Sequence, residues 1–262
     1  MAEHGVAEAA AGVEAACAAF LAAASPDQRG AAERFLLDFR QHPQPLPVCR
    51  HLLLHSSAGY AKLQALYTVR ECLGALWNQL TPEVRAELQQ LLLNQLAAGA
   101  AVERYVSEAA AQVLAVFAKH DLLRSEGTGG AGGAGGAADS LLHGAAQMLD
   151  EPSGVHAEPA LRVLSALLNE FGAPSAGTVG GGLSWSMHAR ARTAFEERYL
   201  AALFRLGKNF LVRSHQQAAG GRALTLCASL LSTALSQVHP AEPAREPPAG
   251  RAGRGLLFGR KQ

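Results

Sequence analysis

The sequence predicts an all-α protein whose helices stack in antiparallel pairs, a HEAT-like helical repeat solenoid. Alanine and leucine, the apolar residues that favour helices most strongly, dominate the 49% of the 262 residues that are hydrophobic. The runs of β-branched residues that would indicate strands are missing. Helix starts are expected near residues 26, 47, 59, 82, 101, 138 and 157, which in pairs give a period of roughly 33 to 42 residues, close to that of HEAT repeats.

The pattern divides the chain into five segments. Residues 1–25 are expected to form an Ala-rich N-terminal helix, and residues 26–126 a first set of helical repeats. The low-complexity segment 127–137, GTGGAGGAGGA, is expected to be a flexible loop because it has no side chains to bury. Further HEAT-like repeats are predicted over 138–238, with a second glycine-rich loop at 173–186 and a disordered tail at 239–262.

Local signals place the individual helices. Ser25 is a suitable N-cap, Pro26 suits the first helical position, and Gln28 lies where a capping-box partner belongs. Thr81-Pro82 repeats the signal. Expected helices cover 47–56, 60–80, 82–98, 101–119, 138–150, 157–172, 190–213 and 216–238.

The spacing of apolar residues in two of these helices predicts specific core residues. An amphipathic stripe on 60–80 contains Tyr60, Leu63, Tyr67, Leu73, Leu76, Trp77 and Leu80, and on 82–98 we expect Val84, Leu88, Leu91 and Leu92 to face the core. Trp77 is thus expected in the core. For Trp185, in the second glycine-rich loop, a plug between repeats is favoured over an exposed position.

Charge and cysteine content exclude several classes of partner. The formal net charge is +1, so there is no global field to attract nucleic acid or an anionic membrane. No apolar run is expected to reach the roughly 20 residues that span a bilayer. No Lys or Arg precedes Arg29, whereas a targeting peptide carries such residues near its start. Four scattered cysteines indicate reduced, mostly buried thiols in an intracellular protein.

No residue pattern in the sequence predicts a catalytic, cofactor or metal site. His51 and His55 have the spacing of a zinc pair, but Leu52 stands where the protease motif has glutamate. The glycines at 129–136 match a nucleotide fingerprint only by spacing, because no βαβ unit surrounds them. Ser184 has no glycine two residues later, as a nucleophile elbow requires. The chain is therefore predicted not to be an enzyme.

Four motifs follow one another in a familiar order: FLLDFRQHPQPLPVC at 35–49, YAKLQALYTVRECLGALW at 60–77, LSALLNEF at 164–171 and AFEERYL at 194–200. Together they resemble, over about residues 27–235, the N-terminal part of exportins, the nuclear transport receptors of the importin-β superfamily. Residues 26–126 are similar to the first HEAT repeats of that superfamily. Because a whole exportin is far longer, the chain is expected to be a truncated form.

The resemblance implies an exportin arm that shuttles between nucleus and cytoplasm. It would bind the GTP form of the small GTPase Ran, protein cargo and nuclear pore proteins, and neither nucleic acid nor membranes. The second helices of the first repeats face Ran in that superfamily, here about 47–56, 82–98 and 138–150. Their outward positions are the candidate partner-facing residues: Arg50, His51, Glu87, Gln90 and Asn94. The alternative is a helical-repeat scaffold without a transport role.

Overall fold

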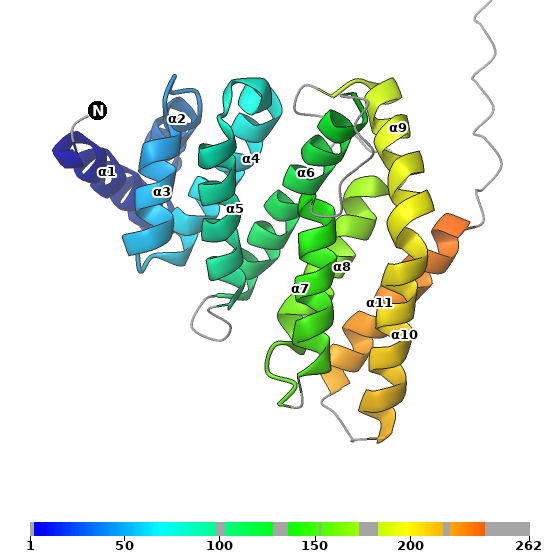
Figure 1. Ribbon diagram of the computed structural model, residues 1–262. Coiled ribbons are helices and arrows are strands. Elements are labelled where there is room, and N and C mark those ends of the chain that lie inside the picture. Colours follow the sequence, from blue (N-terminus) through cyan, green and yellow to red (C-terminus); the bar gives the residue numbers. More distant parts are fainter. Residues whose placement is uncertain are drawn as a thin grey trace, which may run out of the picture.

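Figure 1 shows the computed structural model, which describes residues 3–97, 103–127, 136–151, 153–172, 183–216 and 221–238. These residues form helices and contain no strand, which confirms the all-α prediction. The segments expected as a glycine-rich loop (127–137) and as a tail (239–262) lie largely outside the described residues. The helices are α1 (Glu3–Ala22), α2 (Pro26–Arg40), α3 (Leu46–His55), α4 (Gly59–Leu76), α5 (Pro82–Ala97), α6 (Arg104–Gly127), α7 (Ala137–Asp150), α8 (Ala157–Phe171), α9 (Trp185–Phe195), α10 (Ala201–Gln216) and α11 (Gly221–Val238).

The helices are arranged in two layers that follow the order of the chain (Figure 1). In one layer α4 contacts α6, α6 contacts α8, and α8 contacts α11. In the other, α3 contacts α5, and α7 contacts α10. Each helix of the second layer also packs on the helix that follows it in the chain, which belongs to the first layer. These pairs are α3 and α4, α5 and α6, α7 and α8, and α10 and α11. Helix α1 covers the N-terminal end by packing on α2, α3 and α4.

Most helix starts fall within a residue of their predicted positions because capping chemistry is local. The Ser25 hydroxyl accepts a hydrogen bond from the Gln28 backbone N–H at 3.3 Å, and the Gln28 side chain accepts one from the Ala24 N–H at 3.1 Å. This is close to the expected reciprocal cap. The helix expected from residue 101 begins at Arg104 instead.

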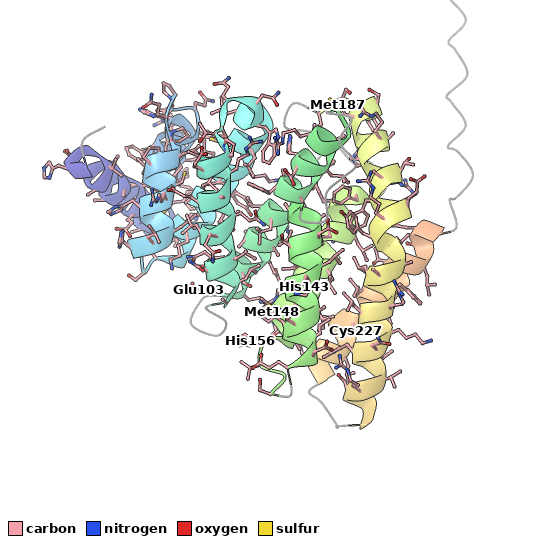
Figure 2. The ribbon with its side chains drawn as sticks, in the orientation of Figure 1. Glu103, His143, Met148, His156, Met187 and Cys227 are labelled. Atoms are coloured by element: carbon pink, nitrogen blue, oxygen red, sulfur yellow. The ribbon has the colours of Figure 1, made fainter. Side chains whose placement is uncertain are left out.

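The helix expected from residue 190 was misplaced. It begins at Trp185 because the Ser184 hydroxyl accepts a hydrogen bond from the Met187 N–H at 3.2 Å, a cap not recognised among the glycines. Trp185 is 62% exposed, so the prediction that it plugs a gap between repeats was wrong. Figure 2 shows its neighbour Met187 near the N-terminal end of α9.

Most of the stripe predicted on α4 packs in the core, including the fully buried Leu73, but one member is exposed. Tyr67, placed in the core by the amphipathic stripe, is 38% exposed. Helix α4 lies between α3 and α6, and small side chains on these sides allow close packing. Its buried residues include Ala61, Ala65, Thr68, Val69 and Cys72.

Trp77 occupies the core, as predicted. Only 5% of it is exposed, in the short 3-10 turn Trp77–Gln79 that follows α4. Its ring meets Phe117 of α6 edge-on at 4.9 Å between centroids, and the Arg85 guanidinium of α5 lies over it at 5.1 Å. The indole thus joins α5 and α6 to the end of α4.

A buried ionic cluster links three consecutive helices of one layer. The Lys119 ammonium of α6, fully buried, lies 2.8 Å from a Glu170 carboxylate oxygen of α8, and Arg70 of α4 lies 3.7 Å from the other oxygen. Burial raises the pKa of Glu170, and the two cations oppose part of that shift. Charges removed from water need such partners to be tolerated at all.

The four cysteines are free and buried, as predicted, and burial raises the pKa of each thiol. Such thiols react poorly because little thiolate forms.

Helix α1 corrects the expectation that no apolar segment reaches the length of a membrane span. His4–Ala22 has a mean hydropathy of 1.4 over 19 residues and is long and apolar enough to cross a bilayer, by length and composition alone. One face packs in the array through Ala10, Val13 and Cys17. Its Glu14 accepts a hydrogen bond from the Ser56 hydroxyl. Only 17% of this apolar stretch is buried, so most of its surface stays exposed.

Trp77→Ala should lower the free energy of unfolding by about 3–5 kcal/mol, the usual cost of truncating a buried aromatic side chain. Trp185→Ala is the matched control and should cost less than about 0.5 kcal/mol, because its ring is mostly exposed. Urea denaturation followed by circular dichroism measures both. Equal effects of the two changes would contradict the assignment of Trp77 to the core.

Glu170→Leu should cost about 3–5 kcal/mol, because it leaves the Lys119 ammonium buried without its carboxylate. The double variant Lys119→Met/Glu170→Leu should recover most of that loss, since both charges are then removed. Urea denaturation of the two single variants and the double variant gives the coupling free energy. A double variant no more stable than Glu170→Leu would mean that the pair is not coupled.

The free energy of unfolding should fall as the pH is lowered from 6.5 to 4. Burial, and secondarily the Lys119 charge, lower the pKa of His120 to about 4, against about 6.5 in the unfolded chain. Over this window the unfolded state binds a proton that the folded state excludes, so about 3 kcal/mol is lost in total. Between pH 7 and pH 5 the free energy of unfolding of the wild type should fall by about 2 kcal/mol more than that of His120→Gln. If the stability of the wild type and of His120→Gln changed with pH in parallel, this prediction would be contradicted. The control is His4→Gln, a change at an exposed histidine that should follow the wild type.

Candidate functional site: a groove between α1, α3 and α5

The outward face of α3 supplies one wall of the site. Val48, Cys49, Leu52 and Leu53 are buried against the array. Because the helix turns by about 100° per residue, the positions between them point outward. That face carries Arg50, His51, Leu54 and His55, and no acidic residue.

Helix α5 supplies the opposite wall. Leu88, Leu91, Leu92 and Leu96 are buried, as the stripe on this helix predicted for the first three. Val84, also predicted to face the core, is 38% exposed, so that expectation was wrong. Val84 lies in the first turn of α5, at the edge of the array.

The two helices and the start of α1 enclose a groove of about 780 Å³. Leu46, Leu88 and Leu91 provide apolar lining, and Leu54, 51% exposed, and Val84 add further apolar surface. Arg50, His51, His55 and Glu87 provide polar groups, and Val6 and Ala7 line the α1 side. An apolar floor with a polar rim is the usual anatomy of a protein–protein contact.

Two buried or part-buried hydrogen bonds hold the walls in place. The Gln95 amide of α5 donates to the Leu53 carbonyl of α3 at 2.9 Å, and Gln95 is buried. The Ser56 hydroxyl, just after α3, donates to Glu14 of α1. Side chains from all three helices therefore set the spacing of the groove.

The structure brings together three of the five candidate residues. The Arg50 guanidinium lies 3.2 Å from the Glu87 carboxylate, which joins α3 to α5 across the groove. Both side chains are more than half exposed, so this ion pair contributes at most about 1 kcal/mol to stability. His51 also lines the groove, with its ring centroid 4.7 Å from that of His55.

The other two candidates lie outside the groove. Gln90 donates a hydrogen bond to Asn94 at 3.0 Å on the exposed side of α5. They share the outward face with Glu87 but do not line the groove. Leu54, His55 and Val84 are lining residues that were not among the candidates. The periodicity of α3 could have found Leu54, since it lies opposite the buried positions 49, 52 and 53.

The described residues show no cluster of three or more His, Cys, Asp or Glu side chains able to hold a metal ion. His51 and His55 form a pair without a third ligand. None of the known protein-family models matches this chain.

Proposed function

We propose that the chain is a HEAT-like solenoid arm of an exportin-like nuclear transport receptor, which binds the GTP form of Ran through the face shared by α3 and α5. It would also contact protein cargo and nuclear pore proteins and shuttle between nucleus and cytoplasm. One observation carries the proposal. Arg50, His51 and Glu87, taken from the resemblance as partner-facing, lie together on a groove with exposed apolar side chains.

The arrangement of the helices supports the same assignment. Each pair in the order α3/α4, α5/α6 and α7/α8 packs on the next, which is how helical repeats bury a continuous core. The three helices expected to face the GTPase, α3, α5 and α7, lie in one layer (Figure 1). A partner approaching that layer would meet the groove and the outer residues of α5 together.

The alternative is a helical-repeat scaffold for protein–protein interaction without a transport role. The same groove would serve either function. The two differ in nucleotide dependence, because a transport receptor distinguishes the GTP and GDP forms of its GTPase and a scaffold does not. The alternative is therefore decided by the same experiment.

The test joins residues 1–235 to the remaining repeats of a complete exportin and measures binding to Ran loaded with GTP or GDP. Replacing Arg50, Glu87, Gln90 and Asn94 together by alanine should weaken binding of the GTP form at least fivefold, since losing interface contacts commonly costs more than about 1 kcal/mol. The melting curve should stay nearly unchanged, because each of the four lies at the surface.

Two half variants and one control sharpen the result. Arg50→Ala/Glu87→Ala alters the groove, whereas Gln90→Ala/Asn94→Ala alters only the outer face of α5, so their comparison locates the contact. Changing Glu33, Arg34 and Asp38, exposed residues on α2, to alanine is the control and should leave binding unchanged. Unaltered binding in the fourfold variant would exclude this surface. Equal binding of the GTP and GDP forms would reject the transport function in favour of the scaffold.

A further inference from the structure

Although the net charge is close to zero, acidic and basic residues are unevenly distributed along the chain. Residues 1–172 contain 11 Lys and Arg against 18 Asp and Glu. Residues 183–238, which include α9, α10 and α11, contain 7 Lys and Arg against 2 Asp and Glu. The C-terminal helices are therefore a basic element attached to an acidic one, and six of those seven cations lie on the segment 185–216.

That segment runs as one continuous helical rod at the C-terminal edge of the array (Figure 1). A π-helical turn, Glu196–Leu200, interrupts it between α9 and α10. Such turns are rare and occur often at functional sites. Tyr199 in this turn is buried, and its burial and the Asp139 carboxylate of α7 raise its pKa. Contacts between α10 and α7 attach the segment to the array.

Two of the basic side chains already have acidic partners. Arg192 lies 2.6 Å from Glu196, and Arg213 lies 2.7 Å from Asp150 of α7. By contrast, Arg205 and Lys208 are exposed and form no ion pair within the described part of the chain. Their charges are therefore available to an outside partner.

Arg205 and Lys208 share a face with apolar surface. Ala201, Arg205, Lys208 and Val212 follow one another at steps of three or four residues, so they lie on one side of α10. All four are exposed, and Val212 is 51% exposed. At about 1.5 Å per residue this face, hereafter the α10 face, is roughly 16 Å long, about three helical turns.

We propose that the α10 face docks an acidic amphipathic helix of a protein partner, whose carboxylates pair with Arg205 and Lys208 and whose apolar side chain packs on Val212 and Ala201. The length and spacing of the face match the i, i+3 and i+7 positions of such a helix. The charge imbalance favours an acidic partner and guides its approach to this end of the molecule. This site is separate from the α3–α5 groove and does not depend on the proposed transport function.

The same observations disfavour two other polyanions. A nucleic acid is usually held by several phosphate contacts, far more than two unpaired cations provide, and the acidic first 172 residues would repel it. Recognition of anionic lipid commonly uses clusters of four to eight basic residues. A short helix with two or three carboxylates requires no more than the α10 face offers.

The test uses the full chain and a fluorescein-labelled, alanine-based helical peptide with glutamates at i, i+3 and i+7 and a leucine at i+10. Fluorescence anisotropy should show binding that weakens as salt is raised. Arg205→Glu/Lys208→Glu should weaken it at least tenfold, and Val212→Ser severalfold. Arg29→Glu/Arg34→Glu on α2 makes the same change in net charge at exposed positions and should alter binding less than twofold.

Several outcomes would overturn the proposal. These are no detectable binding of the peptide, equal loss in the α2 and α10 double variants, or equal binding of a peptide with lysines in place of the glutamates.

Single-stranded oligothymidine or phosphatidylserine vesicles that bound more tightly than the peptide, with the binding lost in Arg205→Glu/Lys208→Glu, would assign the face to that polyanion instead. Sedimentation showing self-association that this variant abolishes would identify a second copy as the occupant. Circular dichroism melts of all variants, expected to coincide with the wild type, confirm that each is folded.

Discussion

The contact between Lys119 and Glu170 is the constraint on which the array depends. A fully buried ammonium group is costly unless a carboxylate replaces its lost water, so this pair disfavours other registers of α6 on α8. Arg70 extends the constraint to α4. The Lys119 charge also contributes, second to burial, to the lowered pKa of His120 and of His188. A few charges thus determine how three consecutive helices meet and how they respond to acid.

The groove between α3 and α5 depends on this layer. Helix α3 rests on α4, and α5 rests on α6, so the separation of the groove walls follows from the distance between α4 and α6. Trp77 reinforces that distance by packing between the end of α4 and Phe117 of α6. The hydrogen bond from Gln95 to Leu53 then sets the walls directly. A partner would meet a preformed groove, and binding would not have to order it.

Sequence patterns predicted the parts of the fold that depend on local chemistry. Caps and prolines located the starts of α2 and α5, and periodicity identified Arg50, His51 and Glu87 as outward-facing residues. Periodicity does not tell which neighbour covers a given face. Tyr67 and Val84 were placed in the core for that reason, although the adjacent helices leave them partly exposed. The exposed Trp185 was missed because the cap formed by Ser184 lies among glycines, which favoured a loop over a helix start.

In a stack of helices each pair contacts mainly its neighbours, so distant surfaces are energetically almost independent. Helices α3, α5 and α10 lie in the same layer, and α7 lies between α5 and α10 (Figure 1). A partner could occupy either the α3–α5 groove or the α10 face without repacking the other. The division of charge would add selectivity to the proposed α10 contact, because residues 1–172 are net acidic and repel an acidic segment. On the two proposals together, the chain would hold chemically different partners at separate surfaces, and charge would direct each partner to its own surface.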